Sequence, residues 1–119
     1  MRTSITALLL ALVLALALAA CGGTAVPATS AGQADPVAGE ALFKLECASC
    51  HSVEAGVDLT GPALAGIGAE DEQSLRDDVV NPDAKVTEGF AKGIMPNSFG
   101  KQLTSQQIDD LIAYLLTLK

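Results

Sequence analysis

The sequence predicts an all-α domain, because three of its segments carry helix signals and none shows the apolar–polar alternation of a strand. The three segments are residues 35–48, 70–80 and 104–118. A chain of 119 residues has the length of one small domain, although its hydrophobic fraction of 50% partly reflects an apolar run at its start. We therefore expect helices and loops alone to build the site.

The first two helices have recognisable ends. Asp35 is a residue type that caps helix N-termini, and Pro36 suits the first helical position. Apolar residues then follow at helical spacing, at Val37, Ala41, Leu45 and Ala48. The second helix, Glu70–Val80, has an acidic first turn that suits the helix dipole, and Asn81-Pro82 stops it.

The last helix begins at a capping box formed by Thr104 and Gln107. One of its faces is apolar along its whole length, at Ile108, Leu111, Ile112, Leu115 and Leu118. The stretches 56–68 and 85–100 contain glycine and proline and are expected to be loops.

Residues 1–20 have a basic start at Arg2, a long run of Ala, Leu and Val, and a small-residue end. This pattern is typical of a secretory signal peptide. An uncleaved transmembrane anchor is the alternative, since a membrane span needs about 20 apolar residues.

The segment Leu18-Ala19-Ala20-Cys21 resembles the lipobox of bacterial lipoproteins, whose signal is cut before the cysteine and whose cysteine thiol carries a diacylglycerol group. The resemblance implies a lipid anchor at Cys21, on the outer, periplasmic face of the bacterial cytoplasmic membrane. Residues 21–34 are small, polar and without periodicity, so they would form a flexible linker. The folded domain would then span residues 35–119.

Two cysteines and the only histidine of the chain stand within residues 47–51, Cys-Ala-Ser-Cys-His. A thioredoxin-like oxidoreductase would need a βαβ context, and no strand-like run lies beside the pair. A zinc site needs four ligands, so carboxylates would have to complete it. C-x-x-C-H is also the attachment signature of c-type haem: Cys47 and Cys50 can meet two vinyl groups on one porphyrin edge, and His51 then lies under the iron. We predict one covalent haem c.

A second axial ligand decides what such a haem does. Once residues 1–20 are removed, Met95 is the one methionine left, and it stands in the irregular stretch Gly93-Ile94-Met95-Pro96. A methionine is usually core filler, but this one is not on a helical stripe. A thioether on a loop is suited to reach across a haem face, so we predict Met95 as the distal ligand.

These residues belong to a wider pattern, over about residues 36–118, that resembles class I cytochromes c. Gly39 to Phe43 is similar to the amino-terminal helix of that family, and Leu111 and Tyr114 match an aliphatic–aromatic pair on its carboxy-terminal helix. The resemblance implies the class I cytochrome c fold, in which these two helices cross beside a covalently bound haem.

Two loops extend the resemblance. Gly61-Pro62 is similar to a Gly-Pro of the family whose proline carbonyl accepts the other N–H of the haem histidine, which implies that Pro62 orients His51. Met95-Pro96 resembles the distal ligand loop. Residues 80–118 are closer still to the cytochrome c domain fused to subunit II of caa3-type cytochrome oxidases, here without a copper-binding domain.

The resemblance implies an electron carrier rather than an enzyme, with no catalytic residue, because both axial positions of the iron are filled. Its partners would be membrane redox complexes: a quinol-oxidising or photosynthetic donor and a cytochrome oxidase as acceptor. The protein would act as a monomer. A haem-based ligand sensor or a peroxidase-like enzyme is the alternative, and either would need Met95 to be displaceable.

The net charge of the chain limits the classes of partner further. Loss of residues 1–20 removes Arg2 and leaves six Lys/Arg against fourteen Asp/Glu, a formal net charge of −8. Such acidity argues against nucleic acid or anionic lipid as a partner. Residues 84–101 nevertheless hold three lysines against Glu88 alone, at Lys85, Lys92 and Lys101. They form either a basic docking rim around Met95 or ordinary solubilising lysines.

Aromatic residues are few in the domain, which has no Trp and only Phe43, Phe90, Phe99 and Tyr114. A domain of roughly 85 residues buries a limited share of its surface and is marginally stable. We therefore expect a haem to complete the core and the apoprotein to be poorly folded.

Overall fold

The computed structural model of the chain describes residues 32–119. The predicted signal peptide, the predicted lipidation site Cys21 and most of the linker predicted at 21–34 lie outside these residues.

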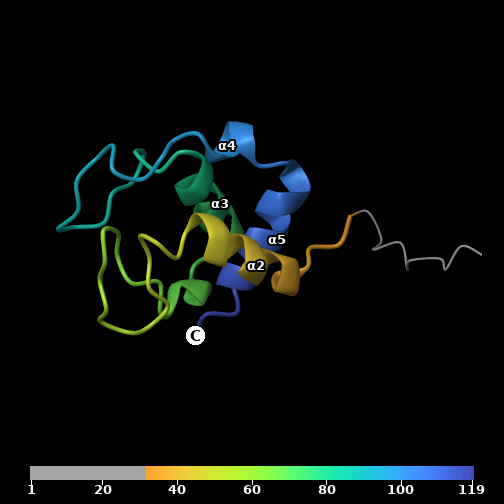
Figure 1. Cartoon of the computed structure of the whole chain (residues 1–119), viewed down its shortest axis with the longest axis horizontal. Coiled ribbons are helices and arrows are strands. Elements are labelled where there is room, and N and C mark those ends of the chain that lie inside the picture. Colours follow the sequence, from red (N-terminus) through yellow and green to blue (C-terminus); the bar gives the residue numbers. More distant parts are fainter. Residues whose placement is uncertain (1–31) are drawn as a thin grey trace, which may run out of the picture. The chain divides into compact units, whose positions relative to one another are not determined.

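Within residues 32–119 the regular secondary structure is helical and includes no strand, so the all-α prediction is confirmed. Figure 1 shows α2 and α5 crossing, with the two long connections 47–66 and 81–98 extending from the same side of the helices. The elements are, in chain order, α2 (Pro36–Glu46), the 3-10 turn η2 (Ile67–Ala69), α3 (Glu72–Val80), α4 (Phe99–Gln102) and α5 (Ser105–Leu115).

Helix α2 begins where the sequence predicts, because the Asp35 side chain accepts the backbone N–H of Val37 at 2.9 Å. Its buried face, however, is not formed by the apolar residues at helical spacing. Val37 and Leu45 are 73% and 79% exposed, whereas Gly39 and Phe43 are buried. The position of the partner helix, rather than the apolar spacing, decides which face of α2 is covered.

Helices α2 and α5 approach most closely at Gly39. A Cβ atom at this position would overlap the backbone carbonyl of Asp110 and lie 2.9 Å from Cβ of Tyr114, so the crossing requires glycine. One turn further on, the rings of Phe43 and Tyr114 pack with centroids 5.4 Å apart and planes tilted by 49°. Such a pair contributes about 0.5–1.5 kcal/mol beyond the burial of its area. The predicted crossing of the terminal helices is confirmed.

The start of the described chain is also bonded to α5. Asp110 Oδ1 accepts the backbone N–H of Asp35 at 2.8 Å and the Gln106 side-chain amide at 2.9 Å. The same amide donates to the Gln33 carbonyl at 3.3 Å. Residues 33–35 are therefore held against α5, at the end of α2 that lies away from the two long connections (Figure 1).

Helices α2 and α5 end at Glu46 and Leu115, earlier than predicted, and two further boundaries differ from the prediction. Helix α3 starts at Glu72 rather than Glu70, because Asp71 caps it and accepts the Ser74 backbone N–H at 3.0 Å. The stretch predicted as a loop up to residue 100 ends instead at α4, whose first residue, Phe99, is buried. Four residues are too few to produce the apolar periodicity by which helices are predicted.

Helix α5 has the predicted capping box. Thr104 Oγ1 accepts the Gln107 backbone N–H at 3.2 Å, and Gln107 Oε1 accepts the Thr104 backbone N–H at 2.9 Å. Leu118 lies beyond the last residue of the helix and is half-buried. The other residues of the predicted apolar face are buried: Ile108, Leu111, Ile112 and Leu115.

We expect Gly39→Ala to lower the free energy of unfolding of the haem-loaded protein by about 1–3 kcal/mol, the usual cost of overpacking. The added methyl group meets the Asp110 backbone, which cannot move aside as a flexible side chain would. Alanine otherwise favours a helix by about 1 kcal/mol over glycine, so any net loss reflects the crossing. Denaturant unfolding measures the change.

Ala38→Ser is the control, at an exposed neighbouring position of α2, and should change stability by less than about 0.5 kcal/mol. A Gly39→Ala variant as stable as the parent would show that the helices can separate at little cost.

Candidate functional site

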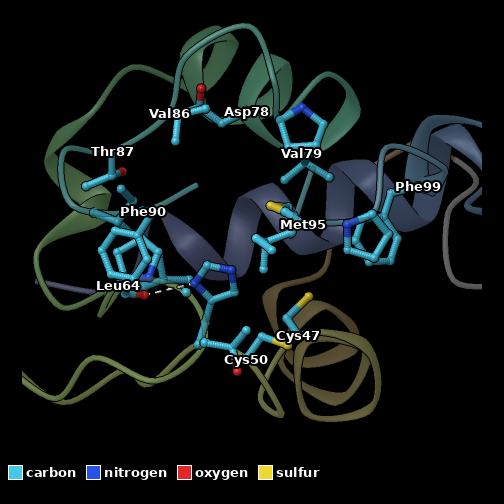
Figure 2. Close-up of a pocket in the computed structure, with 18 of the residues that line it drawn as sticks. Cys47, Cys50, Leu64, Asp78, Val79, Val86, Thr87, Phe90, Met95 and Phe99 are labelled. Atoms are coloured by element: carbon cyan, nitrogen blue, oxygen red, sulfur yellow. Dashed lines mark hydrogen bonds between the residues drawn. The ribbon is translucent and has the colours of Figure 1, made fainter. Parts of the chain in front are cut away.

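A cavity of about 710 Å³ is lined by residues of the four α-helices found within residues 32–119 and of both long connections. Its wall is mostly apolar, and its volume is typical of a cofactor or ligand site. Figure 2 shows Cys47 and Cys50 close together on one wall, with Met95 on the facing side.

The local backbone brings both cysteines and the histidine onto this wall. Cys47 is the C-cap of α2, and its N–H donates to the Phe43 carbonyl at 2.8 Å. One turn follows directly: the N–H groups of Cys50 and His51 donate to the Cys47 carbonyl at 3.0 and 2.9 Å. The end of a helix and a single turn are thus enough to place two thiols and one imidazole on the same cavity.

The imidazole of His51 is oriented by the backbone of the next loop. Its Nδ1 lies 2.9 Å from the Pro62 carbonyl oxygen, a bond drawn dashed in Figure 2. A carbonyl can only accept, so Nδ1 carries the proton and Nε2 keeps its lone pair for a metal. Gly61 lies against the ring: a Cβ there would come 2.5 Å from the Cε1 atom of His51. The histidine therefore packs against a backbone without a side chain.

The loop that carries Pro62 is closed by its own hydrogen bonds. The Gly61 N–H donates to the Cys50 carbonyl at 2.8 Å, and the Leu64 N–H donates to the Ser52 carbonyl at 2.7 Å. Asp58 Oδ1 accepts the Ala63 N–H at 2.8 Å. Asp58 was not predicted, because its side chain bonds a backbone group whose position depends on the folded loop.

Met95 lies on a loop and is half-buried, lining the cavity and packing against the core. Its neighbour Ile94 also lines the cavity but is 56% exposed, so Met95 is the more deeply placed of the two side chains. Just before them, Gly93 has φ +78° and donates its N–H to Asp83 at 2.8 Å. The turn at Gly93 is fixed in this way directly before the two side chains that reach the cavity.

The Cys47 thiol lacks the lowered pKa of a disulfide-exchange nucleophile. Burial, followed by the nearby Glu46 and Cys50, raises the pKa of the Cys47 thiol to about 11. Catalytic thiols in oxidoreductases have lowered pKa values, because the thiolate is the nucleophile. Within residues 32–119 no three His, Cys, Asp or Glu side chains are grouped to hold a metal ion, so no carboxylate joins these residues in a zinc site.

Charged groups also line the cavity. Burial raises the pKa of Asp78, and the positive charge of Lys85 opposes this shift. Lys85 itself lies 3.5 Å from Glu70 in an exposed ion pair. One of the three lysines of the hypothetical docking rim is thus partly neutralised, which weakens that hypothesis; Lys92 and Lys101 remain.

The residues present fit a covalently attached haem. Two neighbouring thiols and a nitrogen donor on one wall, a thioether on the facing side, and apolar surface between them match what a porphyrin and its iron bind. The structure brings together five of the predicted site residues, while Cys21 lies outside the described residues. The five are Cys47, Cys50, His51, Pro62 and Met95.

Comparison with known proteins also supports a haem site. The cytochrome c family matches residues 36–119, which include every residue of the cavity wall. Cytochrome c-554(547) of Halothiobacillus neapolitanus is 34% identical over 91 residues, covering 71% of this chain and 98% of the relative. Cytochrome c6 of Rippkaea orientalis is 36% identical over 82 residues, 69% of each chain. Cytochrome c6 of Aphanizomenon flos-aquae is 36% identical over 88 residues, 70% of this chain and 90% of the relative.

The apoprotein should lack a cooperative fold, because most residues of the core also line the cavity. Of the eight buried apolar core residues within residues 32–119, six also line the cavity: Phe43, Leu75, Val79, Phe99, Leu111 and Leu115. Without a haem these side chains face a void or water, in a domain that is small to begin with.

Circular dichroism during heating measures the cooperativity of unfolding. It is applied to protein made without haem attachment and to the haem-loaded protein. We expect a shallow, non-cooperative loss of helix signal in the apoprotein. A cooperative melt at the temperature of the loaded protein would contradict it.

Proposed function

This chain belongs to the cytochrome c family, and from that premise we propose that it is a membrane-tethered carrier of single electrons whose haem iron is held between His51 and Met95. The family binds one covalent c-type haem, and its members are haem electron carriers that pass electrons to redox partners. When bound, the haem supplies a one-electron iron couple.

The observation that carries the proposal is that all four donors line one cavity. Cys47 and Cys50 would each add S–H across a vinyl group, and both lie on a single turn after α2. His51 offers Nε2 because its Nδ1 is bonded to Pro62. Met95 offers a thioether from the other wall. Because His51 is hydrogen-bonded to Pro62 and Met95 packs against the core, both would stay in place while the haem supplies its one-electron couple.

The alternative function is a ligand sensor or a peroxidase-like enzyme, in which an outside molecule reaches the iron. It requires Met95 to leave its position easily. Met95 is half-buried and packs against the core, and the chain has no second histidine to act as an acid or base there. These observations favour the carrier.

Carbon monoxide distinguishes the two functions. We expect the visible bands of the reduced protein to be unchanged by carbon monoxide, because Met95 closes the iron, and the oxidised protein to show the weak far-red methionine–iron band. Met95→Ala should let carbon monoxide shift the bands. Asn97→Ala is the matched control, at an exposed position of the same loop that does not line the cavity, and should behave like the parent. A parent protein whose bands shift readily would favour the sensor or enzyme.

The tether is proposed at Cys21, in keeping with the lipobox-like segment that ends there. Among residues 32–119, no helix combines the length and apolar character that a membrane span requires. A linker over residues 21–34 would span under about 50 Å when fully extended. The domain would therefore work beside the outer face of the cytoplasmic membrane, as a monomer.

The proposed partners follow from this location. A quinol-oxidising or photosynthetic complex would supply electrons, and a cytochrome oxidase would accept them. The similarity of residues 80–118 to the cytochrome c domain of caa3-type oxidases supports an oxidase as the acceptor.

Mass spectrometry of the full chain expressed in a bacterium tests the tether. We expect the parent to lack residues 1–20 and to carry the added mass of a diacylglycerol group on Cys21. Cys21→Ser should keep residues 1–20 and gain no lipid, whereas Ser30→Ala, inside the linker, should be processed like the parent. A parent that retains residues 1–20 without lipid would indicate a transmembrane anchor instead.

A further inference from the structure

Three groups form a continuous hydrogen-bonded chain behind the proximal histidine. Asp58 Oδ1 accepts the Ala63 N–H at 2.8 Å, and the Pro62 carbonyl oxygen lies 2.9 Å from Nδ1 of His51. The Ala63 N–H and the Pro62 carbonyl are the two ends of one peptide unit. A carboxylate is therefore joined to the imidazole through a single planar amide.

The electronic structure of the amide couples its two ends. Resonance moves charge from the nitrogen to the carbonyl oxygen, so a negative acceptor at the N–H makes the oxygen more negative. Bonds to a charged acceptor are about twice as strong as neutral ones, and linked bonds strengthen one another by perhaps 10–30%. The Pro62 oxygen is thus a better acceptor for the histidine N–H than an ordinary carbonyl.

From this chain of bonds we propose that Asp58 is a positioning residue for His51, which makes the imidazole a stronger donor to the iron and lowers the reduction potential of the haem. The inference rests on the proposed function, because it requires His51 to be an axial ligand. Partners behind a metal-binding histidine fix its ring and raise its basicity, and a more basic ligand favours the oxidised, more positive iron.

The loop fixes the amide that would transmit the effect. The Leu59 N–H donates to the Gly61 carbonyl at 3.0 Å, and Gly61 packs on the imidazole ring itself. Asp58 does not line the cavity, although several other carboxylates do. Its influence on the site would therefore pass through the peptide rather than through direct contact.

The test compares three variants of the haem-loaded protein. Asp58→Asn keeps the shape and one acceptor oxygen but removes the charge, and Asp58→Ala removes the acceptor. Glu54→Gln is the control: it removes one charge from an exposed position of the same loop, where the backbone N–H rather than the carboxylate bonds to Ser52.

Two quantities are measured: the reduction potential, and the proton chemical shift of the His51 Nδ1–H in the reduced protein. We expect the potential to rise in the order Glu54→Gln, Asp58→Asn, Asp58→Ala. The His51 N–H signal should move to lower chemical shift in the two Asp58 variants, because its bond weakens, and stay unchanged in Glu54→Gln.

An equal rise in potential for Asp58→Asn and Glu54→Gln, with an unmoved His51 signal, would reduce Asp58 to an ordinary surface charge. No change in either Asp58 variant would also overturn the inference. In both cases the ring protons of His51 in the parent should still show the large shifts of a haem ligand. Their absence would instead contradict the proposed function itself.

Discussion

The rest of the fold depends on how closely α2 lies against α5. Gly39 lets the backbone of α2 come up to the Asp110 carbonyl, and the Phe43–Tyr114 pair fixes the angle one turn later. Because the crossing fixes the position of α2, it also fixes Cys47, the residue that caps the helix, and the haem-attachment turn follows within the next four residues. The contact between two helices thus decides the position of the cofactor site, although none of its atoms is a ligand.

The core and the functional site of this protein are largely the same surface. Most of the side chains that exclude water from the interior also face the cavity, so stability and haem binding cannot be separated by position. The loops around the cavity pack on the core through residues such as Leu64 and Met95, and backbone hydrogen bonds and carboxylates also hold them, as at Asp58 and Asp83. A small domain can in this way hold both faces of a large planar group in place with short, irregular segments.

Local signals were sufficient for the starts of α2 and α5 and for the predicted site residues that meet at the cavity. Asp35-Pro36 and the Thr104 capping box mark boundaries because a cap acts within a few residues. The spacing of the two cysteines and the histidine by itself indicates haem attachment. The buried face of α2 could not be predicted in the same way, since Val37 and Leu45 are as apolar as any core residue and only the approach of α5 leaves them exposed. Asp58 was missed for a related reason: its partner is a backbone N–H, which every residue of the loop except proline offers.

Residues 33–35 are bonded to α5 through Gln106 and Asp110, at the end of the domain opposite the loops that enclose the cavity. If the preceding linker is anchored as proposed, the attachment point is a fixed pivot on the domain rather than a frayed end. The domain would then swing about that pivot with its haem-bearing end outermost. Linker length would govern the local concentration of that end around a membrane complex. The loops around the cavity would govern electron transfer once the domain and the complex are in contact. Encounter and transfer would thus be set by separate parts of the chain, and each could change during evolution without disturbing the other.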